Sequence, residues 1–109
     1  MNSTKGTGVV GKLTTPTITY KPSKVEIGEI VDVRMTVRQK GEIVIEKRLE
    51  DAEIGEHGFA WLLSQEDTNK LNSSLLMTVQ VDYKTDGGLR YTTIPKSFDV
   101  VDSATSEVI

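Results

Sequence analysis

Apolar and polar residues alternate along most of the chain between residues 31 and 101, a pattern that predicts β-strands separated by turns. In the clearest run, every second side chain is apolar, so one face of the strand is expected to pack on a core and the other to meet solvent. The core-facing positions of this run are predicted to be Val31, Val33, Met35 and Val37.

A hairpin is expected to follow this strand. Gly41, within the segment 39–42, can adopt the positive φ that a tight turn requires. The return strand is then predicted to run through Ile43, Ile45 and Leu49.

Two shorter strands are predicted on either side of this hairpin in the sequence. Residues 17–20 are β-branched or aromatic and are closed by Pro22, which places them at a sheet edge because proline lacks an N–H. In residues 59–63, Trp61 is predicted to lie in the core. Ile54, in the polar stretch between residues 50 and 58, is expected to be a single anchor in a connection or very short strand.

One short helix is predicted between residues 64 and 71. Ser64 is suited to the N-cap position and Asp67 places a carboxylate in the first turn, a variant of the capping box. Asn72 is expected to end the helix because asparagine tolerates the left-handed conformation.

The last third of the chain predicts a long strand, a turn and an interrupted return strand. Apolar positions from 77 to 83 alternate with polar ones up to the turn at residues 85–88, whose Asp-Gly pair is a strong hairpin signal. The return strand starts at Leu89, is bent or ended by Pro95, and resumes at Phe98.

These elements predict an all-β fold: an immunoglobulin-like β-sandwich of about seven strands, preferred to a closed barrel, with one short helical element near residues 64–71. At 109 residues the chain is expected to form one domain. Residues 1–14 are predicted to be a flexible glycine-rich arm that becomes ordered only by docking on a neighbour or pairing with a sheet edge. The sandwich is placed at residues 15–102 and a polar tail at 103–109.

The charge pattern disfavours nucleic acid and membrane surfaces as partners. The net charge is −3, with 13 basic and 16 acidic residues interspersed, so no basic face for phosphates is visible. No apolar run approaches the roughly 18 residues of a membrane span, and no export signal is visible at the start. The absence of cysteine excludes disulfides and thiolate chemistry.

Residues 6–12 match the sequence pattern of a nucleotide-binding loop but lack the flanking elements that such a loop requires. Their glycine pattern matches a dinucleotide loop and most of a phosphate loop. However, no core strand precedes them, Leu13 replaces the hydroxyl residue that would bind magnesium, and Pro16 follows. We therefore interpret them as part of the arm.

The other candidate groups are isolated or adjacent in sequence. His57 is the only histidine and has no second soft ligand beside it. The acid pairs at 50–51 and 66–67 are better explained by capping and solubility than by acid–base catalysis. The sequons at 2–4 and 72–74 are interpreted as chance matches. The sequence thus predicts no catalytic, metal or cofactor residues, no small-molecule substrate and no enzymatic activity.

Several segments resemble small tail-associated proteins from phages and prophages of Gram-positive bacteria. The similarity covers residues 15 to 109. The layout of these segments is similar to that of the N-terminal immunoglobulin-like modules of phage baseplate upper proteins. The segments that carry this similarity are Thr15-Pro16-Thr17, Val33 to Gln39, Gly41 to Lys47, Leu63 to Thr68, Val79-Gln80-Val81, Asp86-Gly87-Gly88 and Glu107-Val108-Ile109. The glycine-rich arm at residues 1–12 is a difference, because the short members of this group lack such an arm.

This resemblance implies a virion structural or accessory protein of the tail or baseplate, made in the bacterial cytoplasm and located in the virion. Its expected partners are other virion proteins and further copies of itself. The alternatives are a carbohydrate or cell-surface binding immunoglobulin-like module and a capsid-decorating protein. The carbohydrate alternative requires three of the four rings of Trp61, Tyr20, Tyr83 and Tyr91 to be exposed on one face.

Overall fold

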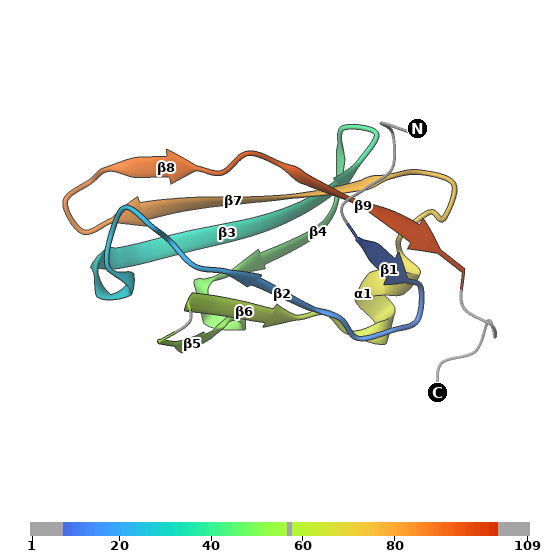
Figure 1. The fold of residues 1–109 in the computed structure, drawn as a ribbon, viewed down its shortest axis with the longest axis horizontal. Helices are drawn as coiled ribbons and strands as arrows, with labels where there is room; N and C mark the ends of the chain where they lie inside the picture. Colours follow the sequence, from blue (N-terminus) through green and yellow to red (C-terminus); the bar gives the residue numbers. More distant parts are fainter. Residues whose placement is uncertain (1–7, 57, 103–109) are drawn as a thin grey trace.

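The computed structural model describes residues 8–56 and 58–102, which form nine strands in two facing sheets (Figure 1). The larger sheet has the order β1-β9-β7-β3-β4, with β8 also paired to β7, and the smaller has the order β2-β6-β5. The larger sheet consists of β1 (Val9–Gly11), β3 (Ile30–Gln39), β4 (Glu42–Arg48), β7 (Met77–Thr85), β8 (Arg90–Thr92) and β9 (Lys96–Val101). The smaller consists of β2 (Thr17–Tyr20), β5 (Glu53–Gly55) and β6 (Gly58–Leu62). The helical elements are α1 (Gln65–Asn69) and two 3-10 turns, η1 (Ile27–Glu29) and η2 (Leu49–Asp51).

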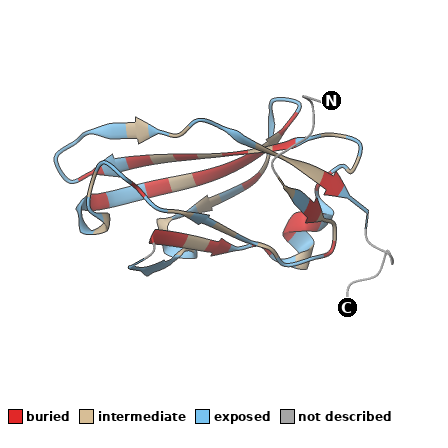
Figure 2. Ribbon diagram, in the orientation of Figure 1, coloured by how far each residue is buried: buried red, intermediate tan, exposed pale blue. Residues whose placement is uncertain are grey.

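The all-β sandwich predicted from the alternating pattern is confirmed. Buried positions line the inner faces of both sheets (Figure 2). The strand order, with β3, β7 and β8/β9 facing β2, β6 and β5, is compatible with an immunoglobulin-like arrangement in which strands C, F and G face B, E and D. The immunoglobulin-like assignment itself stays a prediction.

The prediction that Val31 belongs to the core-facing side of β3 is wrong. Val31 is 51% exposed, while its neighbour Ile30 is only 7% exposed and joins the core. The pairing register between β3 and β7 shifts between Ile30 and Asp32. Such a shift exchanges the two faces of a strand, so the period of two holds only from Val33 onward.

The hairpin between β3 and β4 is a two-residue turn. Lys40 and Gly41 both have positive φ, 54° and 79°, and Gln39 pairs with Glu42. This is the conformation whose twist matches that of the flanking strands. A second register shift lies between Val37 and Arg38 and leaves Ile43 exposed.

The outer edge of β7 is covered by a strand broken in two. β8 pairs with residues 82–84 and β9 with residues 77–79, as the interruption at Pro95 predicted. Thr93 bridges the break: its N–H donates to the Val81 carbonyl, and its hydroxyl accepts from the Val81 N–H, both at 3.0 Å. The side chain thus replaces a missing backbone acceptor.

The sandwich begins earlier than the boundary predicted at residue 15. Residues 9–11 form β1, which pairs in parallel with β9, and both Val10 and Leu13 are buried. Pairing with a sheet edge was one of the two ways in which this segment was expected to become ordered. Residues 1–7 and 103–109 lie outside the described residues.

The core is centred on two aromatic residues of β6. Trp61 is fully buried, as predicted, and its ring stacks with that of Phe59 at a centroid distance of 5.9 Å. The Trp61 indole N–H donates to the Arg48 carbonyl at 3.0 Å, which ties the two sheets together. Ile54 forms a very short strand but is 55% exposed, so the prediction that it anchors the chain is wrong.

The predicted capping box of α1 is confirmed, but the predicted end of the helix is wrong. Ser64 and Asp67 each accept a hydrogen bond from the other's backbone N–H. The helix ends at Asn69, with Lys70 as its C-cap in a right-handed conformation. Among the described residues other than glycine, only Leu13 and Lys40 have positive φ, so Asn72 does not end the helix in the left-handed conformation.

Candidate functional site

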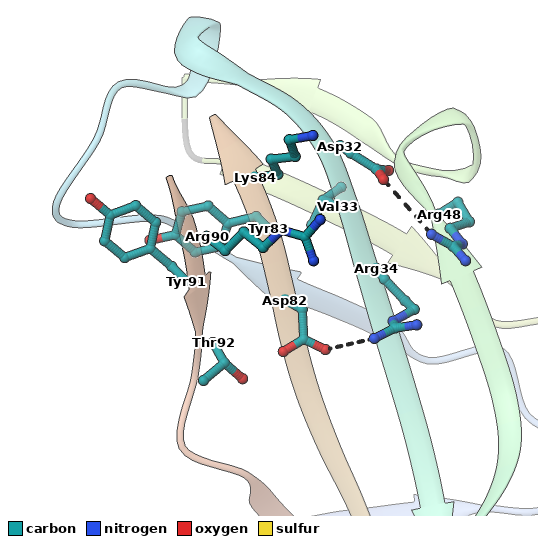
Figure 3. A pocket seen from close by; sticks show the side chains of 10 residues that line it. All are labelled: Asp32, Val33, Arg34, Arg48, Asp82, Tyr83, Lys84, Arg90, Tyr91 and Thr92. Carbon is teal, nitrogen blue, oxygen red and sulfur yellow. Dashed lines mark ion pairs between the residues drawn. The ribbon is translucent and has the colours of Figure 1, made fainter. Parts of the chain in front are cut away.

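A shallow hollow of about 460 Å³ lies over one end of the large sheet, where β3, β4, β7 and β8 run side by side (Figure 3). Its lining combines charged side chains from the outer face with two tyrosine rings. The residues that line it are Asp32, Val33, Arg34, Arg48, Asp82, Tyr83, Lys84, Arg90, Tyr91 and Thr92.

The pairing register of the strands brings the charged side chains together. Arg34 lies opposite Asp82 on β7 and opposite Arg48 on β4, while Lys84 lies between Asp32 and Arg90. Because paired residues on one face of a sheet have neighbouring Cβ atoms, Arg34 meets Asp82 and Lys84 lies beside Asp32. The same register places like charges side by side in the pairs Arg34–Arg48 and Lys84–Arg90.

Three ion pairs lie on this face, two between strands and one within β4. The Arg34 guanidinium lies 3.5 Å from the Asp82 carboxylate. Arg48 lies directly opposite another arginine, and its guanidinium is 3.2 Å from Glu46 and 3.8 Å from Asp32. These side chains are about one third to one half exposed, so each pair is worth roughly 0.2–1 kcal/mol. The pairs therefore contribute little to stability, and the lining of the hollow keeps an excess of positive charge, with four cationic side chains against two carboxylates.

The tyrosines beside the hollow form a chain of three rings. Tyr83 stacks on Tyr91 at 5.1 Å between centroids and contacts Tyr20 of the other sheet at 5.8 Å. Burial, assisted by a hydrogen bond with Tyr20, raises the pKa of Tyr83 to about 12. Tyr83 therefore keeps its proton at neutral pH and supplies no phenolate.

The carboxylates of Asp32 and Asp82 are each engaged by an arginine instead of converging on a substrate position. Among residues 8–56 and 58–102, no group of three histidine or acidic side chains is arranged to hold a metal ion.

The groups considered in the sequence lie apart from this hollow. Asp51 and Asp67 accept hydrogen bonds from the backbone N–H groups of Arg48 and Ser64, so both acid pairs contribute to capping, as predicted. Within residues 6–12, which match the pattern of a phosphate-binding loop, residues 9–11 form strand β1. His57 and residues 1–7 lie outside the described residues.

The outer-face charges were partly visible in the sequence. Asp32, Arg34, Thr36 and Arg38 were expected to point away from the core because they alternate with apolar residues. For Thr36 this prediction is wrong, since this residue is only 1% exposed. The partners of the outer-face charges on β7 and β8 depend on the register of strands about 50 residues apart in sequence, for which local patterns give no signal.

A second hollow, also of about 460 Å³, opens between the two sheets along β2. Its floor is formed by core side chains of β7, and its rim by residues of β1, β2 and β9. It is mostly apolar, with Lys96 as its single charged lining residue among the described part of the chain.

No protein-family model matches the chain, and no curated protein sequence matches it. Within the described ranges, the longest α-helix, α1, has five residues, so no helix here is long and apolar enough to cross a membrane.

Proposed function

We propose that this chain is a structural or accessory component of a phage virion, in the tail or baseplate, and that it acts through protein–protein surfaces. The proposal rests on the resemblance of residues 15–109 to phage tail-associated proteins. It involves no enzymatic step, cofactor or small-molecule substrate.

The structural observation that supports this proposal is the paired charge pattern around Arg34 and Asp82. On the two central strands of this accessible sheet face, an aspartate is followed two positions later by a cation: Asp32 and Arg34 on β3, and Asp82 and Lys84 on β7. Arg48 and Arg90 on the flanking strands add further positive charge. Such a face gives specificity and orientation to a protein contact, because a partner with complementary charges is favoured and others are repelled. The same face lacks the converging, desolvated groups that catalysis would require.

The four rings do not favour the carbohydrate alternative. Trp61 and Tyr83 are buried, and Tyr20 and Tyr91 are half-buried within the stacked chain of tyrosines. The condition of three exposed rings on one face is therefore not met. A capsid-decorating role would use the same kind of surface and differs only in the location of the protein.

Mass spectrometry of particles purified from the encoding phage or induced prophage tests this proposal. We expect peptides of this chain in intact particles after density-gradient purification and washing in high salt. Their absence from particles, with the protein present in the host lysate, would exclude a virion component.

A further inference from the structure

The outer edge of β2 is a free strand edge within the described part of the chain. β2 pairs only with β6, and the Leu63 N–H donates to the Pro16 carbonyl at 2.9 Å. Hydrogen-bonded positions alternate along an antiparallel pair, so Ile18 and Tyr20 also bond toward β6. The N–H and C=O groups of Thr17 and Thr19 therefore point away from the sheet.

The other edges of the two sheets carry features that oppose strand pairing. β4 has a register shift and an inward-pointing Lys47, whose ammonium lies 3.0 Å from the Asp67 carboxylate. β1, β5 and β8 have only three residues each, and β5 and β8 carry the charged residues Glu53 and Arg90. Irregularities, inward charges and short length are the usual protections of edge strands.

β2 is also short, with four residues, but it has neither a register shift nor a charged side chain. Its residues 17–20 are uncharged and regularly paired with β6. The flanking prolines lie outside the strand, and the Pro16 carbonyl accepts from the Leu63 N–H of the neighbouring segment, so Pro16 faces the β6 side and not the free edge. Both threonines are exposed.

The surface next to this edge is mostly apolar. On the outer face of the small sheet, Thr17 pairs with Leu62, which is 64% exposed, and Thr19 pairs with Ala60. The apolar hollow between the sheets opens along the other side of β2. An added strand would thus meet polar backbone groups flanked by apolar surface, the combination that favours strand addition.

We propose that the β2 edge pairs antiparallel with the β2 edge of a second copy of this chain. The two small sheets then form one continuous six-stranded sheet about a two-fold axis. Thr17 of each copy lies opposite Thr19 of the other and exchanges two backbone hydrogen bonds with it, while the two Ile18 residues face each other on the axis. This contact is independent of whether the protein belongs to a virion.

The self-pairing is compatible with the charges that flank β2. In this register Lys21 lies opposite Thr15 of the second copy, so the two Lys21 residues are six positions apart, or about 20 Å along the strands. This separation exceeds the Debye length of about 8 Å at physiological salt. The paired threonines additionally favour each other across strands.

Cysteine crosslinking tests the register directly, because the chain contains no cysteine. In the predicted pair the two Cα atoms are about 5.5 Å apart, within the range of a disulfide. We expect mild oxidation of a mixture of Thr17→Cys and Thr19→Cys chains to give a disulfide-linked dimer of one copy of each. Each variant alone should give little dimer, and crosslinking of Thr17→Cys alone at the level of the mixture would overturn the register.

Sedimentation of the unmodified chain over a concentration series tests the dimer itself. We expect a monomer–dimer equilibrium whose Kd rises about tenfold or more in Thr17→Lys/Thr19→Lys, which places like charges opposite each other. The control variant Ile43→Lys/Leu89→Lys adds the same charge at exposed positions away from β2 and should leave the Kd unchanged. A chain that stays monomeric throughout, or equal weakening by both variants, would overturn the proposal.

Discussion

The Gln39 side chain binds the backbone of Asn72 in both directions. Its amide nitrogen donates to the Asn72 carbonyl at 2.8 Å, and its amide oxygen accepts from the Asn72 N–H, also at 2.8 Å. The same nitrogen reaches the Leu75 carbonyl at 3.1 Å. A buried side chain at the end of β3 thereby fixes the loop that leads from α1 into β7.

Replacing Gln39 by leucine should destabilise the protein by about 1–3 kcal/mol, because three hydrogen bonds to backbone groups are lost and only the Asn72 carbonyl keeps another donor, the Leu75 N–H. Urea unfolding monitored by Trp61 fluorescence would measure the change. Gln65→Leu is the control, since its side chain has no such role, and it should change the free energy of unfolding by a few tenths of a kcal/mol at most. An equal loss in the two variants would contradict the role assigned to Gln39.

Asp67 links the stability of the fold to acidic pH. Burial of this carboxyl opposes its ionisation, but the hydrogen bond from the Ser64 backbone N–H and the nearby Lys47 ammonium outweigh burial and hold the pKa of Asp67 below its ordinary value of 3.8. The folded state therefore favours the charged form. Its stabilising contribution is complete above the unfolded pKa and is lost as the pH falls through the lower, folded pKa.

We expect Asp67→Asn to unfold at lower urea concentration at neutral pH, with a loss of about 1–3 kcal/mol, and to lose less stability than the unmodified chain on acidification. Glu66→Gln removes the neighbouring exposed carboxylate and should keep the acid sensitivity of the unmodified chain. Parallel pH dependences of all three proteins would show that Asp67 is not the group responsible.

Tyr83 should make the fold sensitive to strongly alkaline pH. Its pKa is raised to about 12 by burial and the hydrogen bond with Tyr20, against an ordinary value of 10.0. Because the folded state retains the proton more tightly, this stabilising contribution is present below pH 10 and is lost as the pH rises toward 12. Ultraviolet titration should show one phenol fewer ionising between these values than in the unfolded chain, and this difference should disappear in Tyr83→Phe.

Tyr91→Phe serves as the matched control because it keeps Tyr83 and the aromatic stack. It should retain the late-ionising phenol. If Tyr83→Phe also retained that phenol, the assignment to Tyr83 would be incorrect.

Gly58 has no room for a side chain at the start of β6. Its φ is +108°, and a Cβ atom would contact the Tyr20 carbonyl and lie 2.8 Å from the Lys21 Cα. Gly58→Ala should therefore cost about 2–4 kcal/mol, from the strained backbone and the displacement of β2. Gly55→Ala, on the adjacent strand with nothing within 4 Å, should change stability far less. Thermal unfolding of the two variants measures the difference, and similar melting temperatures would contradict the close approach of β2.

The sequence predicted the elements of this fold where local chemistry decides them. The turn at Gly41, the capping box at Ser64 and the interruption at Pro95 each depend on residues a few positions apart, and all were found. The exposure of Val31 was missed because it results from a register shift against β7, a strand about 50 residues away. The candidate site escaped prediction for the same reason, since Arg34 meets Asp82 only through the pairing of β3 with β7.

Separation of purified particles into heads and tails, followed by quantification of this chain in each fraction, tests the proposed role most directly. The account predicts that the chain remains with tails or baseplates at a constant copy number per particle and is absent from heads. Recovery only in the soluble lysate would contradict a virion role, and recovery only with heads would contradict its assignment to the tail or baseplate.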